Sequence, residues 1–487
     1  MAKWLKTGWV LGACFLQVGA CKVMTDVDRD LIPFGGAAGV TGTAGAPGSG
    51  GTGTGGDSCE LPTEFRWTST GPLIGPISDA DHDLVSIKDP TVVRFEDRWH
   101  IYATTATRAD EEGGSSWSLV YLSFSDWAHA GSAEQIYIDV NEDLRGYHAA
   151  PQLFYFTDQD SWYLIFQSPA PQFSTTTDIS DPSSWSAPES FFSASMGSFF
   201  EDTPDEERPN PWIDFWVICD ETHCYLFFTG DNGKFYRSRT ARDDFPQGMS
   251  DPELVMEVPF EDRYSLWEGS ATYKLKGEDR YLTIIEAMGG PAGARYYRSF
   301  VADTLDGEWT PLADTWQNPF AGPSNVVSYD DLPSAGGAGG AVPGDAGASA
   351  TAGAAGSLAA TAGGAAGNGG AVGAGGEGGA ASVADGGQAG APSGGGGIGS
   401  AGAPASAAGA DGQSGAAGAA QVPWTQDISH GELLRDGYDE TMTIDACNLQ
   451  LLYQGRAPQS DTGDYSQLPY RLGLLTLAPA EEPEPEE

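Results

Sequence analysis

The predicted folded part of the chain consists of short runs of aromatic and β-branched residues separated by polar turns. Clear examples are TVVRFEDRWHIYATT at 91–105, PQLFYFTDQDSWYLIFQ at 151–167, CYLFFTGDNGKFYRS at 224–238 and ATYKLKGEDRYLTIIEA at 271–287. Apolar positions that recur with the helical period of 3.6 residues are nearly absent. This pattern predicts an all-β protein built from many hairpins.

The hairpins repeat along the chain. Aligned on the aromatic residue that follows each polar turn, Trp99, Tyr163, Tyr225 and Tyr281 take the same place, at separations of 64, 62 and 56 residues. A fifth candidate, DACNLQLLYQG at 445–455, comes late in the chain. About 60 residues suits a four-stranded blade with long loops, so the repeat predicts a five-bladed β-propeller. A β-sandwich with irregular strand spacing is the alternative.

Two tracts differ from this pattern in composition. Residues 35–57 and 334–421 are rich in Gly and Ala and hold almost no aromatic or branched apolar residue. Such segments lack the apolar area that would offset their chain entropy, so we expect both to be disordered. The predicted parts are a signal peptide at 1–20, a Gly-rich stalk at 21–57, a propeller domain formed by 58–330 and 422–477, a disordered Gly/Ala-rich insertion at 331–421 and an acidic tail at 478–487.

Acidic residues greatly outnumber basic ones. The 487 residues include 24 Lys and Arg against 68 Asp and Glu, which gives a formal charge of −44. Nucleic acid is therefore excluded as a partner, because phosphate neutralisation needs clustered cations. Adsorption to anionic lipid headgroups is disfavoured for the same reason. We expect a soluble, monomeric protein with a neutral or cationic ligand.

The N-terminus, MAKWLKTGWVLGACFLQVGACKV, has the layout of a secretory signal. Lys3 and Lys6 precede an apolar stretch that is too short to span a bilayer. The stretch closes on small residues directly before Cys21, which resembles a bacterial lipobox. The resemblance implies cleavage before Cys21, lipid attachment to its sulfur, and a protein held at the cell surface by that lipid alone. Ordinary secretion to the extracellular space is the alternative.

Four further cysteines lie in the predicted domain, and an even number in an oxidising compartment favours disulfides. Cys59 and Cys447 stand near its two ends, so a bond between them would tie the domain termini together. Cys219 and Cys224 are close enough in sequence to pin a hairpin. A zinc site with His223 is the competing idea, although one histidine beside one thiol pair is a weak signal.

Three acids occupy similar positions in their repeat units. Asp89, Asp214 and Glu268 precede their marker aromatic residues by 10, 11 and 13 positions, and the second unit has Gln152 at the matching offset. The innermost strand of a blade borders the propeller channel, so we expect the three carboxyl groups to converge at one end of it. Glu286 is a rival acid, predicted on the strand after the turn and away from the axis.

Each of the three acids is flanked by apolar or aromatic residues, in SIKDPTVV, PWIDFWVI and SLWEGSATY. Desolvation raises the pKa of a carboxyl group that has no partner, whereas a neighbouring cation lowers it. We expect Lys88 to keep Asp89 ionised. Opposed environments of this kind separate a general base from a general acid.

These motifs together resemble glycoside hydrolase family 62, whose members are α-L-arabinofuranosidases. The matching stretches run in order from about Cys59 to Leu477 and include FRWTSTGPL (65–73), IKDPTVV (87–93), WIDFWVICD (212–220), LWEGSATYKLKG (266–277), YLTIIEAMGG (281–290) and DYSQLPYRLGLLTL (464–477). The resemblance implies a five-bladed propeller that hydrolyses α-L-arabinofuranosyl branches of arabinoxylan or arabinan with inversion.

The resemblance also implies catalytic roles for the three acids. Asp89 corresponds to the general base, Glu268 to the general acid, and Asp214 to the carboxylate that tunes and orients the acid. A related propeller glycosidase of family 43, acting on arabinan or xylosides, is one alternative function. A non-catalytic carbohydrate-binding lipoprotein is another.

Ligand contacts follow from the same resemblance. It implies sugar contacts from Lys88, Arg295 and Tyr465, and a structural calcium ion near the channel with His430 as a ligand. Histidine is an unusual calcium ligand, because calcium prefers oxygen donors. For His430 the alternative is a hydrogen-bonded strand residue.

Overall fold

The structure is a computed structural model, and it describes residues 59–109, 115–168, 170–194, 196–200, 212–289, 293–329, 423–458, 460 and 464–479. The predicted signal peptide, Cys21, the stalk, the Gly/Ala-rich insertion and all but two residues of the acidic tail lie outside these ranges. Within them, no helix has the length and apolar character needed to cross a membrane.

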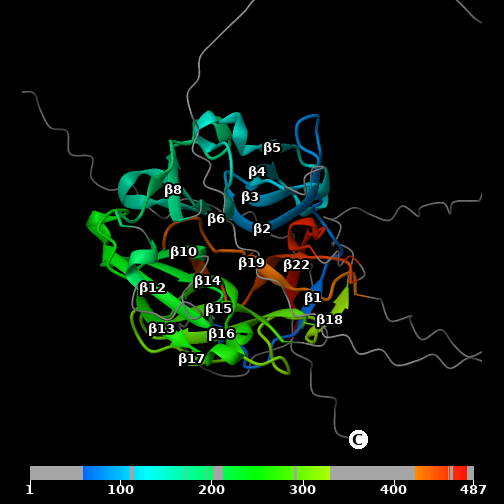
Figure 1. Cartoon of the computed structure of the whole chain (residues 1–487). Coiled ribbons are helices and arrows are strands. Elements are labelled where there is room, and N and C mark those ends of the chain that lie inside the picture. Colours follow the sequence, from blue (N-terminus) through cyan, green and yellow to red (C-terminus); the bar gives the residue numbers. More distant parts are fainter. Residues whose placement is uncertain are drawn as a thin grey trace, which may run out of the picture. The chain divides into compact units, whose positions relative to one another are not determined.

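Hairpins of the predicted kind build five sheets, which are the blades of a β-propeller (Figure 1). Blade one is β2 (Leu84–Phe95), β3 (Arg98–Thr107), β4 (Trp117–Phe124) and β5 (Gln135–Tyr137). Blade two is β6 (Ala149–Phe156), β7 (Ser161–Ser168), β8 (Ala170–Thr176) and β9 (Glu189–Ser190). Blade three is β10 (Ile213–Cys219), β11 (His223–Thr229), β12 (Lys234–Ala241) and β13 (Glu253–Glu257).

Blades four and five draw on distant parts of the chain. Blade four is β14 (Glu268–Leu275), β15 (Tyr281–Met288), β16 (Arg295–Ala302) and β17 (Thr310–Pro311), with β20 (Thr443–Ile444) added beside β14. Blade five is β19 (Ser429–Leu433), β21 (Gln450–Gly455), β22 (Arg471–Leu477), β1 (Trp67–Ser69) and β18 (Val326–Tyr329). The described helical segments are short 3-10 turns: Trp127–Ser132, Ile138–Val140, Glu142–Leu144, Thr157–Gln159, Pro182–Ser184, Met196–Phe200, Arg242–Asp244, Phe260–Ser265 and Tyr465–Gln467.

The inner strands close into a ring. Strand β2 contacts β6, β6 contacts β10, β10 contacts β14, β14 contacts β19, and β19 returns to β2. Blade five joins the two ends of the domain, because β1 pairs antiparallel with β22 (Figure 1). The prediction of a five-bladed propeller is confirmed, and the irregular sandwich is wrong.

Both predicted cysteine pairs are disulfides. The bond between Cys59 and Cys447 spans 388 residues of sequence and ties the start of the described domain to blade five. The bond between Cys219 and Cys224 joins directly paired residues of β10 and β11. The second bond uses the two thiols on which the zinc alternative depended, so that alternative is wrong.

Each inner strand carries a β-bulge in its pairing with the next strand. At every bulge the inner strand has one residue more than its partner, and such an insertion bends the strand and re-aims a side chain. The bulges lie between Lys88 and Thr91, Ala149 and Gln152, Ile213 and Trp216, Glu268 and Ala271, and Ser429 and Gly431.

Four of the bulges contain a residue in the left-handed backbone region: Asp89, Ala150, Asp214 and Gly269 have φ angles of 47°, 49°, 58° and 63°. The counterpart of Asp89 in blade two is therefore Ala150, and the sequence alignment was wrong to give that place to Gln152. The error arose because the turn between β6 and β7 has four residues where the turn between β2 and β3 has two, and because Tyr163 lies one residue further into its strand than Trp99. The amide of Gln152 instead accepts from the Val217 N–H and donates to the Val217 carbonyl, each at 2.7 Å, and so links blades two and three.

Candidate active site

The bulges bring side chains from all five blades around one pocket of about 210 Å³. Its lining residues are Lys88, Asp89, Trp117, Tyr147, Ala150, Gln167, Ile213, Asp214, Asp231, Glu268, His430, Gln454 and Tyr465. The three acids predicted to converge are all among them. So are two of the three predicted sugar-contacting residues, Lys88 and Tyr465, and the predicted calcium ligand His430.

Asp89 is a buried carboxylate held by cations. Its Oδ2 lies 3.5 Å from Lys88 Nζ, and its backbone N–H donates to Gln454 Oε1 at 2.8 Å. Burial alone would raise the pKa of Asp89, but the charges of Lys88 and His430 outweigh it and hold the pKa below its ordinary value. Asp89 is therefore ionised and able to accept a proton.

Asp214 has the opposite electrostatic setting. Burial, together with the charges of Glu268 and Asp89, raises the pKa of Asp214 to about 6, against the opposing effect of His430. Its Oδ2 accepts a hydrogen bond of 2.7 Å from the Gly269 N–H, which belongs to the residue directly after Glu268. Asp214 thus fixes the backbone that carries Glu268.

Glu268 opens β14, and its side chain is 15% exposed. The guanidinium group of Arg295, from β16, bonds to the carboxyl groups of both Glu268 and Glu286. It also lies 5.5 Å from the centre of the Tyr465 ring. Arg295 was expected to contact the sugar, but it is not among the lining residues of the pocket. In the structure it is a partner of the acid.

Glu286 lies on β15, the second strand of its blade, as predicted, but its carboxyl group is part of the site through Arg295 and the His430 N–H. It pairs directly with Glu268 across β14 and β15, and directly opposed residues share a face of the sheet. Glu286 is fully buried, and its Oε2 accepts a 2.9 Å hydrogen bond from the His430 N–H. Burial and the Glu268 charge raise the pKa of Glu286 to about 7, although Arg295 opposes them.

His430 is the extra residue of the blade-five bulge. Its Nδ1 lies 3.7 Å from an oxygen of Asp89 and 3.7 Å from an oxygen of Asp214. Burial would lower the pKa of His430, but the Asp214 and Asp89 charges more than offset this and raise it. Calcium takes six to eight oxygen ligands, and the described residues include no group of three or more His, Cys, Asp or Glu arranged to hold a metal. The described side chains alone therefore do not supply a set of calcium ligands around His430.

Sequence reasoning missed five lining residues with polar or aromatic side chains. Gln167 and Gln454 are buried amides that accept the backbone N–H groups of Asp214 and Asp89. They lie within strands, where no sequence signal separates them from other strand residues. Asp231 stands in a GDNG turn, where acids are common for local reasons. The other two are Trp117 and Tyr147.

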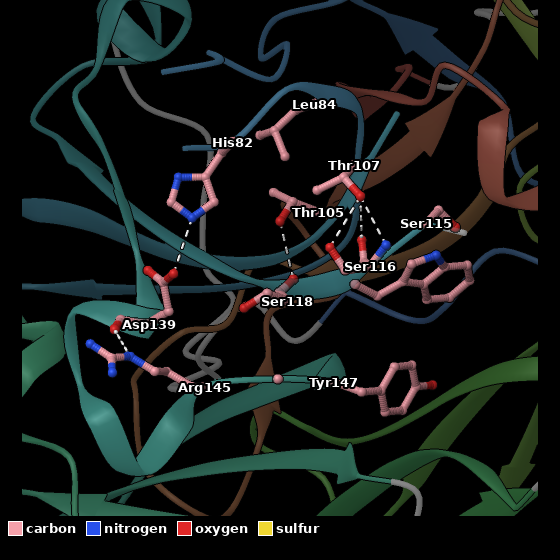
Figure 2. A pocket seen from close by; sticks show the side chains of 12 residues that line it. His82, Leu84, Thr105, Thr107, Ser115, Ser116, Ser118, Asp139, Arg145 and Tyr147 are labelled. Atoms are coloured by element: carbon pink, nitrogen blue, oxygen red, sulfur yellow. Dashed lines mark hydrogen bonds and ion pairs between the residues drawn. The ribbon is translucent and has the colours of Figure 1, made fainter. Parts of the chain in front are cut away.

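An aromatic rim joins this pocket to a second cavity. Lys88 Nζ lies 3.7 Å from the centre of the Trp117 ring and donates to the Tyr465 hydroxyl at 3.3 Å. Trp117 and Tyr147, whose ring centres are 6.3 Å apart, line both spaces. The second cavity measures about 630 Å³. Figure 2 shows its hydroxyl-bearing wall of Thr105, Thr107, Ser115, Ser116 and Ser118, with His82, Asp139 and Arg145 beyond.

Comparison with known proteins finds relatives over most of the chain. The model of glycosyl hydrolase family 62 matches residues 66–334 and 397–476. α-L-Arabinofuranosidase C of Cellvibrio japonicus (strain Ueda107) is 34% identical over 425 residues, which are 87% of this chain and 49% of that protein. The chain therefore spans about half the length of this curated relative.

Solved structures match over a similar share. The catalytic domain of a Coprinopsis cinerea family 62 α-L-arabinofuranosidase has 35% identity and a TM-score of 0.61, covering 86% of this chain and 98% of that one. An α-L-arabinofuranosidase from Podospora anserina in complex with cellotriose has 32% identity and a TM-score of 0.62, with the same coverage. A family 62 hydrolase in complex with xylotriose has 33% identity and a TM-score of 0.61, covering 85% and 98%.

Proposed function

This chain belongs to glycosyl hydrolase family 62, and from that membership we propose that it is an α-L-arabinofuranosidase that removes arabinofuranosyl side chains from arabinoxylan or arabinan. The observation that carries the proposal is the convergence of Asp89, Asp214 and Glu268 on one small pocket. Hydrolysis of a glycosidic bond requires a proton acceptor and a proton donor, and Asp214 accepts a hydrogen bond from the residue next to the proposed donor.

We infer that the reaction inverts the configuration of the sugar. The ionised Asp89 takes a proton from a water molecule as the oxygen of that water bonds to the anomeric carbon. The bond from that carbon to the leaving oxygen breaks, and Glu268 supplies the proton that the leaving oxygen needs. The guanidinium group of Arg295 lies against Glu268, so it stabilises the carboxylate that remains after proton transfer.

The adjoining cavity supports a polymeric substrate. A furanosyl branch in the smaller pocket would leave its main chain at the Trp117 and Tyr147 rim, and the larger cavity continues from there. Aromatic rings with an apolar face and a polar edge suit pyranose rings, and the hydroxyl-bearing wall suits their hydroxyl groups. Relatives in complex with xylotriose and cellotriose make a β-1,4-linked main chain the natural candidate.

Proton NMR of the first sugar released from wheat arabinoxylan tests substrate and stereochemistry together. We expect β-L-arabinofuranose to appear first, before mutarotation, and no xylose to be released from xylo-oligosaccharides. First appearance of the α-anomer would refute inversion. Release of xylose would favour a xylosidase of the family 43 kind. Binding of arabinoxylan without any release of sugar would favour a non-catalytic carbohydrate-binding protein.

The variant Glu268→Gln tests the proposed acid. Loss of general acid catalysis should lower kcat by about 10²–10⁴-fold and leave substrate binding measurable. Glu261→Gln is the matched control, because Glu261 is an exposed acid in the turn before β14. An unchanged rate of arabinose release in Glu268→Gln would remove this residue from the mechanism.

We also propose that the protein is a monomer displayed at a bacterial cell surface through a lipid on Cys21. The lipobox-like sequence supports the lipid attachment, and mass spectrometry of the N-terminal peptide from the native host would test it. The calcium ion near His430 stays a prediction of the family resemblance. Metal analysis of the purified protein, before and after dialysis against a chelator, would test it.

A further inference from the structure

Asp231 is a fourth carboxyl group in the pocket and has no role in the mechanism above. It follows β11 in the turn toward β12, and it lines the pocket together with Asp214 and Glu268. Its φ angle of 55° places it in the left-handed backbone region, which side-chain-bearing residues adopt at a cost. The turn explains this conformation, because Asp is one of the residues that tolerate it, but it does not explain why the carboxyl group lines the pocket.

The surroundings of Asp231 oppose its ionisation. Its Oδ1 is buried and has no hydrogen-bond partner among the described residues. A carboxylate with a buried oxygen that lacks a donor loses hydration without compensation, so the neutral acid is favoured. Burial, together with the charges of Glu268 and Asp214, raises the pKa of Asp231 to about 9, although Arg295 opposes them.

Hydrogen-bond donors are unevenly distributed around the pocket. The lining side chains that can donate at neutral pH and take no part in the proposed proton transfers come from blades one, two and five, such as Lys88, Gln167 and Tyr465. On the wall formed by blades three and four, the lining side chains other than Asp231 are Ile213 and two of the proposed catalytic acids. A sugar hydroxyl facing that wall needs a donor for its oxygen.

We propose that Asp231 is a further substrate-binding residue, and that its neutral carboxyl group donates a hydrogen bond to a hydroxyl oxygen of the sugar held in the pocket. The inference rests on the proposed function, because it needs a sugar in this pocket. A neutral acid supplies the missing donor without adding charge beside Asp214 and Glu268. The opposite interpretation is an ionised Asp231 that stabilises positive charge on the sugar in the transition state.

Two variants separate these interpretations. Asn and Gly both tolerate the left-handed conformation of residue 231, but only Asn keeps a donor there. For a neutral donor we expect Asp231→Asn to lower kcat/KM by about threefold or less, and Asp231→Gly to lower it by about tenfold, mainly through KM. Equal large losses in both variants would support an ionised Asp231 and overturn the proposal. Wild-type kinetics in both would also overturn it.

The control variant is Asp97→Gly. Asp97 is an exposed acid with a φ angle of 60° in the turn between β2 and β3, so it repeats the backbone change away from the pocket. We expect it to keep wild-type kinetics. The melting temperature of every variant shows whether the protein is folded. If wild-type protein releases arabinose and the Asp231 variants match it, only this inference fails; if wild-type protein releases none, the proposed function itself fails.

The affinity for substrate measured at several pH values gives a further test, because a purely structural role of Asp231 would not make binding depend on its ionisation. Calorimetric titration of Glu268→Gln with an arabinosylated xylo-oligosaccharide should show affinity falling as pH rises and Asp231 ionises, at a pH below 9 because this variant lacks the Glu268 charge that helps to raise the pKa of Asp231. The double variant with Asp231→Asn should lack this fall. The other charged groups that influence Asp231 are Asp214, Glu286 and Arg295. The pKa values of Asp214 and Glu286, about 6 and about 7, lie below that of Asp231, and loss of the Glu268 charge lowers both further; the pKa of Arg295 lies above it. A pH-independent affinity in both proteins would contradict the proposal.

Discussion

Replacing Gly269 by alanine tests whether the bulge in β14 sets the position of the proposed acid. Gly269 follows Glu268, has a φ angle of 63°, and donates its N–H to Asp214 at 2.7 Å. A Cβ atom added there would lie 3.1 Å from Glu286 Oε2 and 3.3 Å from Glu286 Cβ. The substitution therefore introduces both backbone strain and crowding next to the acid.

The two effects have different sizes and different consequences. Left-handed backbone at an alanine costs about 1–2 kcal/mol of folding free energy. The crowding cannot be relieved by a small movement of Glu286, because this fully buried side chain is bonded to Arg295 and to the His430 N–H. Glu268 must then shift instead, and a misplacement of about 1 Å can cost about 10²-fold in rate. We expect kcat to fall about 10- to 100-fold.

Gly277→Ala is the matched control, because Gly277 also lies in the left-handed region, with φ = 77°, but has no atom within 4 Å of an added Cβ. Denaturant unfolding and initial rates of arabinose release would be measured for both variants. Both should lose about 1–2 kcal/mol of stability from the shared backbone strain, and only Gly269→Ala should lose activity. A Gly269→Ala variant with wild-type kcat, or equal loss of activity in the two, would refute the reasoning.

Three further predictions concern stability and positioning. Burial lowers the pKa of His100 from 6.5 to about 4. As pH falls, the unfolded chain therefore takes up a proton on this residue before the folded protein does, and up to about 3 kcal/mol of stability is lost between about pH 6.5 and pH 4. Thermal melts over this pH range should show a smaller loss in His100→Gln. Replacing Cys59 and Cys447 by serine opens a loop closed over 388 residues and should cost up to about 6 kcal/mol in denaturant unfolding; an unchanged midpoint would contradict this. Gln454→Leu removes the side-chain oxygen that accepts the Asp89 N–H. Measured at a pH where Asp89 stays ionised, kcat should fall about tenfold; an unchanged kcat would show that Asp89 keeps its position without this hydrogen bond.

The repeat in the sequence was sufficient to predict the architecture because its markers are equivalent in space. Trp99, Tyr163, Tyr225 and Tyr281 all lie at or near the start of the second strand of their blades, β3, β7, β11 and β15. Blade five was predicted only from its hairpin at 445–455, since its outer strands come from both sides of the Gly/Ala tract. Pairing of β1 with β22 depends on ring closure, which no local pattern encodes.

Details of the site were harder to predict, because strand periodicity records neither the bulges nor the lengths of the turns between strands. The offsets of Asp89, Asp214 and Glu268 from their markers differ, and the fourth left-handed position belongs to Gly269, one residue after the acid. The contacts of Glu286 with the site were not predicted for a related reason. Seven of the eight residues of β15 are buried, so alternation cannot tell which face a residue takes. Its direction follows only from its register with Glu268.

The five bulges are a shared feature of the backbone, and the residues that they carry give each blade a different chemical group. They place Asp89, Ala150, Asp214, Gly269 and His430 at matching positions of the ring, and only the side chains differ. Ala150 lines the pocket, so a carboxyl group there would add a further charge to a space in which burial already raises the pKa of Asp214 to about 6. Like charges raise each other's pKa values. An acid in blade two would therefore work against the ionisation of Asp89 on which the proposed base depends, and the methyl group of Ala150 avoids that conflict.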